Sequence, residues 1–312
     1  SLEHRLDAAR IYLYAAEQHL ASDEGIALYK EVASYREPRH AAIEQQLHLD
    51  MSFHCCFGDM TKAGDMASEL RTLVRSSQES AHRMLGNIGI VLFRAGRASE
   101  ALAVIHDAAS FSLRFGLMTT SANLSAYLST IYFTIGDEPN GHLWHQRADD
   151  ICRQHVLADP FYHISNRIEL SLRRGDIEAA KQDLELWEGA YQGIVAPYPS
   201  RARHAFRVMA LHLEGQLRND TADIDALLRL DDLGRNIAEH DGFAHALYLA
   251  LESCGLIEEA HARFTRYLRH SRRELHPLSR YLADFAASRG FAPGDAGSEH
   301  RSTLDGRVMT TT

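Results

Sequence analysis

The sequence predicts an all-α protein built as an array of about seven antiparallel helix hairpins, each of roughly 40 residues. A short phrase recurs at this spacing, in which a glycine is followed five residues later by an alanine or another small residue. Apolar residues recur at helical spacing on both sides of each glycine. Alternating β-branched runs are absent, and the prolines fall between hairpins or in the first turn of a helix.

The segment around Gly96 illustrates why this phrase predicts a hairpin. One helix is expected over 81–95 and a second over 99–115. A glycine adopts positive φ readily, so Gly96 can end the first helix and reverse the chain. Ala101 is small enough for the second helix to pack closely against the first. The apolar stripe of the second helix then continues through Leu102, Ile105 and Ala109.

The other hairpins follow in chain order. The first is expected to turn at Ser22, and the recurring phrase places later turns at Gly58, Gly96, Gly136, Gly175 and Gly255. The interval before Gly255 is twice the usual period, so a further hairpin is predicted near residue 215. There, residues 217–228 supply a polar turn but lack the glycine–alanine pair. In the hairpin of Gly136, Gly141 takes the place of the alanine.

The chain divides into a helical repeat domain at 1–286 and a tail at 287–312. From residue 287 the sequence is rich in Gly, Ser and Thr and lacks apolar periodicity, which predicts a disordered tail or linker. The chain begins without an initiator methionine, which indicates a piece of a longer protein. We therefore expect the linker to lead to a further domain.

The recurring glycine, aliphatic and alanine positions resemble the start of the second helix of the tetratricopeptide repeat. Residues 86–105 carry the resemblance best, with Gly89 at the small position of the first helix. The resemblance covers roughly 1–285, with a period nearer 40 than the usual 34 of that family. It implies a TPR-like α-solenoid that coils into a right-handed superhelix. Repeats of this length are similar to those of bacterial LuxR-type activators and peptide-sensing regulators.

The composition of the chain argues against several classes of protein. The net charge of −9 argues against non-specific binding of nucleic acid or anionic lipid. No apolar run approaches the roughly 20 residues of a membrane span, and residues 1–10 indicate an amphipathic helix rather than a signal peptide. The four cysteines include no CxxC pair, which favours buried thiols in a reducing cytoplasm. The basic segment 261–276 is expected to complement a helix macrodipole, with an acidic partner as the alternative.

The sequence contains no nucleotide-binding or hydrolase motif, so we expect a protein that is not an enzyme and needs no cofactor. His142, His145 and Asp149 are spaced by single helical turns and could in principle face one metal ion. Such spacing is common by chance, and we expect a solvated or partly packed helix with no metal. These three residues are the single local candidate for an enzyme.

The resemblance implies that the first helices line a concave groove, so groove residues can be indexed from each turn glycine. The position nine residues before it is often a peptide-binding asparagine in this family. Asparagine suits a peptide amide because it donates and accepts, arginine suits a carboxylate, and tyrosine offers stacking area. The alternative is that these side chains are bonded within the fold. The candidates are Asn87, Tyr127 and Asn166 (nine before), Arg83, Asn123 and Tyr162 (thirteen before) and Arg173 (two before).

These observations predict a non-enzymatic protein- or peptide-recognition part of a cytoplasmic bacterial regulator, with its partner in the concave groove. The alternative is a small-molecule or signalling-peptide receptor domain that switches an attached output domain. Neither interpretation requires direct contact with nucleic acid or membrane. A homodimer is a further alternative, since the ends of a repeat array expose apolar faces.

Overall fold

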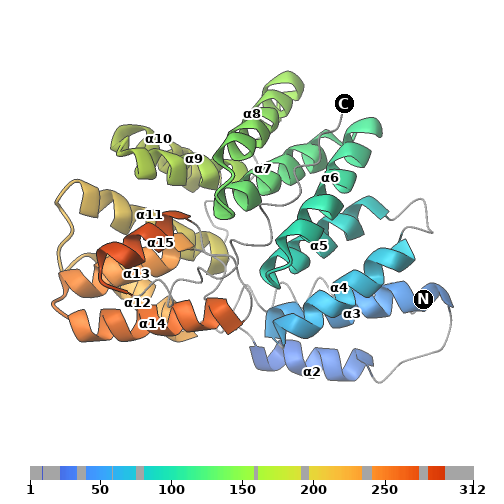
Figure 1. The fold of residues 1–312 in the computed structure, drawn as a ribbon, viewed down its shortest axis with the longest axis horizontal. Helices are drawn as coiled ribbons and strands as arrows, with labels where there is room; N and C mark the ends of the chain where they lie inside the picture. The colour runs from blue at the N-terminus through green and yellow to red at the C-terminus, as the bar shows by residue number, and fades with distance from the viewer. Residues whose placement is uncertain are drawn as a thin grey trace.

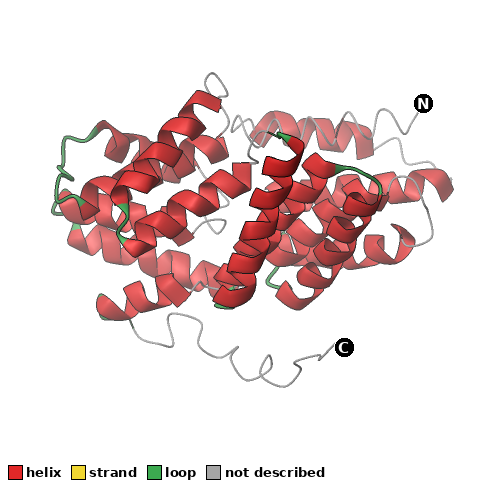
Figure 2. Cartoon of the chain, turned by 90° about the horizontal axis from the view of Figure 1, so that it is seen from above, coloured by secondary structure: helices red, strands yellow, loops and turns green. Residues whose placement is uncertain are grey.

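The computed structural model describes residue 9 and residues 22–33, 40–57, 59–74, 81–157, 161–190, 197–233, 241–273 and 280–291. These residues form fourteen α-helices and no strand (Figures 1 and 2). The helices are α2 (Ser22–Ala33), α3 (His40–Phe57), α4 (Met60–Val74), α5 (Ala81–Arg94), α6 (Ala98–Arg114), α7 (Met118–Thr134), α8 (Glu138–His155), α9 (Phe161–Arg174), α10 (Ile177–Ala190), α11 (Pro197–Leu213), α12 (Ala222–Leu233), α13 (Asp241–Ser253), α14 (Ile257–Arg273) and α15 (Arg280–Ser288).

The helices pair into antiparallel hairpins as predicted, so the all-α solenoid is confirmed. Six hairpins are described with both helices, from α3/α4 to α13/α14. Of the first predicted hairpin, the structure describes α2 and Ala9, which is buried against Leu49 of α3. The predicted turn at Gly58 lies outside the described residues. Asp59, which follows it, accepts hydrogen bonds from the backbone amides of Thr61 and Lys62 at the start of α4.

The turns between paired helices have the left-handed backbone that the glycine phrase predicts. Gly96, Gly136, Gly175 and Gly255 have φ between 73° and 82°. At Gly96 the backbone amide donates to Phe93 O, and that of Arg97 donates to Leu92 O, so the last carbonyls of α5 are satisfied. An L-residue with a Cβ would be strained here, which explains why the repeat carries glycine at this point.

The hairpin predicted near residue 215 is present as α11 and α12. Its turn does contain the glycine that the sequence analysis did not recognise, because Gly215 has φ of 67°. The position five residues later is Asp220 rather than alanine. The turn is correspondingly longer, and α12 begins only at Ala222. The glycine rule therefore holds in this repeat, and only the small partner residue is missing.

Close approach of the paired helices depends on small residues. A Cβ built on Gly89 of α5 would lie 2.2 Å from Cγ1 of Ile105 on α6, so a larger residue has no room. In the next hairpin, the ring of Phe133 fills the space beside residue 141. A Cβ on Gly141 would lie 2.6 Å from that ring, which explains why glycine replaces the usual alanine.

The hairpins stack into an arc in which the first helices lie on the inside. First helices of successive hairpins pack on one another, as α7 does on α9, α9 on α11 and α11 on α13. Among the described residues, no pair of successive second helices makes comparable contact. Helices that touch on one side and spread on the other give a curved solenoid with the first helices on the concave surface. Figure 1 shows this arc running from α2 through α8 to α14.

The described fold continues beyond residue 286, the expected end of the domain. α15 ends at Ser288, and Phe291 packs on the core, with its ring 4.9 Å from that of His261 and 5.0 Å from that of Phe264. Residues 292–312, which include most of the predicted tail, lie outside the described residues. Within the described residues, no helix combines the length and apolar character required to cross a membrane.

Gly89→Ala should destabilise the protein, because the new methyl group would collide with Ile105 inside the α5/α6 hairpin. Overpacking of this kind costs about 1–3 kcal/mol, which outweighs the gain in helix propensity of about 1 kcal/mol. The free energy of unfolding in urea measures the change.

Gly189→Ala is the matched control, since a Cβ at this exposed position of α10 meets no atom within 4 Å. It should leave stability unchanged or raise it by up to about 1 kcal/mol. Equal effects of the two substitutions would contradict the role of Gly89 in helix packing.

Candidate functional site

One face of each first helix points away from its own hairpin partner. In α5, Gly89 faces α6, and residues 83, 87, 90 and 94 share the opposite side because they are three or four positions apart. These positions lie thirteen, nine, six and two residues before the turn glycine. The same four positions can therefore be compared in each first helix.

This face is polar in the middle of the array and apolar towards its C-terminal end. In α11 and α13 the nine-before and six-before positions hold the buried residues Phe206, Met209, Ala246 and Leu249. In α5, α7 and α9 the same two positions hold the partly buried Asn87, Thr130 and Glu169, the buried Tyr127 and Asn166, and one partly buried apolar residue, Ile90. Polar side chains that are not fully buried also occupy the thirteen-before position of α7 and the two-before position of all three helices. We call this set the inner polar face: Asn87, Arg94, Asn123, Thr130, Thr134, Glu169 and Arg173.

The predicted residues nine before the glycine contact the neighbouring first helix. The Nδ2 atom of Asn87 lies 3.4 Å from Nε2 of His48 on α3. Asn166 is only 6% exposed, and its amide donates to the backbone oxygen of Ala126 on α7 (3.0 Å) and accepts from the Thr130 hydroxyl (2.9 Å). These side chains therefore connect successive hairpins through the polar bonds that the alternative interpretation anticipated.

Tyr127 is also 6% exposed and lies in the core, where its ring meets that of Phe93 edge-on with centroids 6.1 Å apart. Its ring face offers little stacking area to a ligand. Asn123, one helical turn earlier on α7, is exposed. Of the predicted residues on α7, Asn123 is therefore the one whose side chain is open to solvent.

Arg173 forms an ion pair with Glu169 on the same helix, and both side chains are mostly buried. Arg83 lies in α5 and Tyr162 in α9, but their side chains are outside the described residues. Thr130 and Glu169, at the six-before position, were not among the predicted site residues. Residues three or four positions apart share one face of a helix, so counting three residues on from the nine-before position would have indicated both.

The inner polar face offers hydrogen bonds rather than acid–base chemistry. Asn87 and Asn123 carry amides, Thr130 and Thr134 carry hydroxyls, and each group can pair with a peptide backbone or another polar ligand. Arg94 donates to the thiol of Cys55 at 3.1 Å. On this face as the structure describes it, Glu169 is the one carboxylate and Arg173 holds it, so the face lacks a carboxylate pair for general acid–base work.

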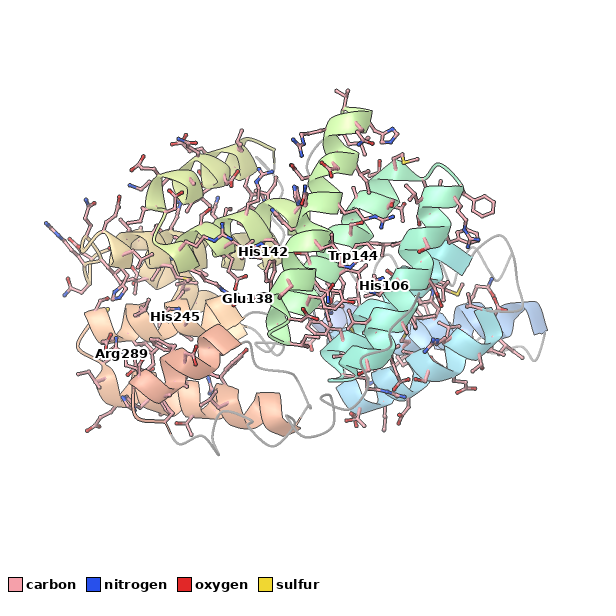
Figure 3. All side chains as sticks on the ribbon, turned by 45° about the horizontal axis from the view of Figure 1, so that its top comes forward. His106, Glu138, His142, Trp144, His245 and Arg289 are labelled. Atoms are coloured by element: carbon pink, nitrogen blue, oxygen red, sulfur yellow. The ribbon has the colours of Figure 1, made fainter. Side chains whose placement is uncertain are left out.

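The candidate metal set on α8 is divided between two environments. His142 is exposed, with Nε2 3.3 Å from the Arg174 guanidinium and its ring against Phe133 (Figure 3). His145 is mostly buried, and its ring lies 4.6 Å from that of His163 on α9. His163 Nε2 in turn lies 3.6 Å from an Asp149 oxygen. Across the described residues, no three His, Cys, Asp or Glu side chains are arranged to hold a metal.

Two buried histidines have strongly lowered pKa values. Burial lowers the pKa of His145 to about 4, with further lowering from His163, Arg167 and His142 and an opposing effect of Asp149. Burial lowers the pKa of His245 on α13 to about 3, and the charges of His212, Arg289 and Arg173 act in the same direction. His245 and Arg289 lie close together in Figure 3, and both contact the ring of Phe285. Both histidines are therefore neutral near pH 7.

The protein should lose stability as pH falls from 7 towards 5. The unfolded chain protonates these histidines near pH 6.5 and the folded chain only near 4 and 3, so acid favours the unfolded state between these values. At pH 5.5 each histidine contributes a loss of about 1 kcal/mol. Urea denaturation at pH 7.5 and 5.5 measures the difference.

His145→Gln removes one of the titrating histidines and should reduce the loss of stability between pH 7.5 and 5.5 by about 1 kcal/mol. His155→Gln, at an exposed site of the same helix, is the control for the exchange of histidine for glutamine. A pH dependence of wild-type size in His145→Gln would contradict this assignment.

No family model matches the chain, and no curated protein matches it in sequence. Among solved structures, the chain is similar to the Rap conjugation gene regulator of the plasmid pLS20 in complex with the Phr* peptide. The TM-score is 0.56 at 13% sequence identity, over 92% of this chain and 88% of the other. At this identity the likeness concerns the fold, and it agrees with the helical repeat architecture.

Proposed function

We propose that this chain is a binding module that holds an extended peptide along the inner polar face of α5, α7 and α9. The proposal rests on one observation: side chains at equivalent positions change from mostly polar to apolar along the successive first helices. At the nine-before and six-before positions, most side chains of α5, α7 and α9 are polar, apart from Ile90 and Tyr127, whereas all four in α11 and α13 are apolar and buried. A polar row restricted to three adjacent helices suits a ligand of limited length.

The dimensions of the face favour a short peptide. Of these first helices, α7 packs on α9, and packed helices lie about 8–10 Å apart. An extended chain advances about 3.3 Å per residue, so about three residues cross this pair of helices, and contacts on α5 require a longer ligand. Asn123 is the exposed amide of this row, and Thr130 and Thr134 continue it along α7. These groups can pair with peptide amides whatever the peptide side chains are.

The likeness in fold to a regulator solved with a bound peptide supports the same class of ligand. We accordingly assign the chain to the non-enzymatic recognition part of a bacterial regulator that acts in the cytoplasm.

The second candidate is a receptor for a small polar molecule that switches an attached output domain. The observation in its favour is that Asn87, Thr130 and Arg173 are already bonded to neighbouring side chains. This leaves a smaller exposed area around Asn123 and Thr134. The two candidates share the face and differ in the length of the ligand.

Pooled synthetic hexapeptides should raise the free energy of unfolding of the full chain. A ligand at 100 times its dissociation constant adds about 2.7 kcal/mol when it binds only the folded state. Asn123→Ala should weaken binding of the selected peptide about tenfold by removing one amide pairing. Denaturant titration and fluorescence anisotropy are the measurements.

Gln146→Ala, at an exposed position of the second helix α8, is the control and should bind with wild-type affinity. Stabilisation by a pool of polar metabolites, with none from the peptides, would favour the small-molecule receptor. Peptide binding that Gln146→Ala impairs and Asn123→Ala leaves intact would contradict the assignment to the inner polar face.

A further inference from the structure

The apolar core is divided into two parts along the array. One cluster joins α3 to α8 and extends from Met51 to Trp144, and another joins α9 to α15 and extends from Ile164 to Ala286. A small cluster of Ala122, Ile151 and Cys152 lies within α7 and α8. We call α3–α8 the N-terminal body and α9–α15 the C-terminal body. The boundary between the two clusters falls between hairpin α7/α8 and helix α9.

The packing of successive hairpins also changes at this boundary. Earlier in the chain, α4 packs extensively along α5, and α6 packs in the same way along α7. α8 makes only slight contact with α9, which packs on α7 instead, and the later second helices α10 and α12 likewise make little contact with the first helix that follows each of them. Figure 1 shows α8 projecting away from the α9/α10 hairpin. The two bodies are therefore joined mainly through one pair of first helices.

Polar side chains fill this junction. Asn166 of α9 donates to Ala126 O of α7 and accepts from Thr130. Beside it, the rings of His145 and His163 face each other at 4.6 Å. We call these residues the seam. Directional hydrogen bonds favour one relative arrangement of the two bodies. They do not add the large buried apolar area that stabilises an apolar interface.

One buried polar atom of the seam gains no hydrogen bond. His145 Nδ1 of α8 has no partner within the described residues. An unpaired buried polar atom costs free energy that contact with water would restore. Opening the seam would hydrate this atom, which offsets part of the cost of separating the helices.

The C-terminal end of α8 carries backbone strain. Val156, which ends α8, has φ of 52°, and it is the one non-glycine residue of the described chain with positive φ. A β-branched residue is disfavoured there, and the Val156 side chain is 92% exposed, so its packing does not compensate.

We propose that the seam is a hinge, about which the N-terminal and C-terminal bodies move as separate units. The motion changes the spacing of α7 and α9, and with it the width of the concave surface. The hinge follows from the division of the core and from the seam contacts, and it does not depend on what the inner polar face binds.

Distance measurement by electron spin resonance tests the hinge in the full chain. Spin labels on keto amino acids at Ser110 of α6 and Glu185 of α10 report the distance between the bodies. A Ser110–Lys62 pair reports within the N-terminal body, and a Glu185–Ala262 pair reports within the C-terminal body. All four positions are exposed, and the native cysteines remain in place.

Asn166→Ala removes both seam hydrogen bonds, and Thr130→Val removes one with little change in volume. The second variant carries the test if the first does not fold, as judged by circular dichroism. Ser129→Ala is the matched control, because Ser129 donates to Gly141 O within the α7/α8 hairpin.

The hinge predicts that the seam variants shift or broaden the Ser110–Glu185 distance distribution and leave both within-body distributions unchanged. Ser129→Ala should keep the wild-type distribution between the bodies. An unchanged Ser110–Glu185 distribution in folded seam variants would overturn the hinge. So would equal broadening of the within-body pairs, since the array would then be soft throughout.

Discussion

The fold depends on one backbone constraint, the left-handed glycine turn that closes the hairpins from α5/α6 to α13/α14. Glycine at this turn lets the chain reverse within a few residues, and the small residues Gly89 and Ala101 then let the paired helices approach. Because the turn recurs about every 40 residues, equivalent positions of successive first helices come into register. Because of this register, side chains that are far apart in the sequence lie in rows on one surface.

The rows differ in chemistry along the array, and the difference separates two roles. At the nine-before and six-before positions, α11 and α13 carry apolar residues that contribute to the core. At the same positions α5, α7 and α9 are mostly polar, with Ile90 and Tyr127 as exceptions, and these helices supply both the inner polar face and the contacts between hairpins. Asn166 belongs to the seam by its bonds to Ala126 and Thr130, whereas Asn123 on the neighbouring helix remains exposed. The proposed binding face and the proposed hinge are therefore neighbours on α7 and α9.

The sequence is sufficient for the hairpins, because each is specified locally by a glycine, a small partner and apolar periodicity. The sequence could not distinguish side chains that are open to a ligand from side chains that are buried between neighbouring hairpins. Tyr127 and Asn166 occupy the predicted row, but their burial depends on how closely α7 approaches its neighbours, which no local pattern encodes. His145 was grouped with residues of its own helix, whereas its ring partner, His163, comes from the next hairpin. Gly215 was not predicted as a turn glycine because no alanine follows it five residues later, although its positive φ matches that of the other turns.

The central claim is that a ligand lies along the first helices of mid-array. Hydrogen-exchange mass spectrometry of the full chain, with and without the tightest-binding hexapeptide of the pool, tests it most directly. Bound peptide should slow amide exchange in α5, α7 and α9 and leave the second helices α10, α12 and α14 unchanged. Slower exchange confined to α11–α14 or to the outer helices would contradict it.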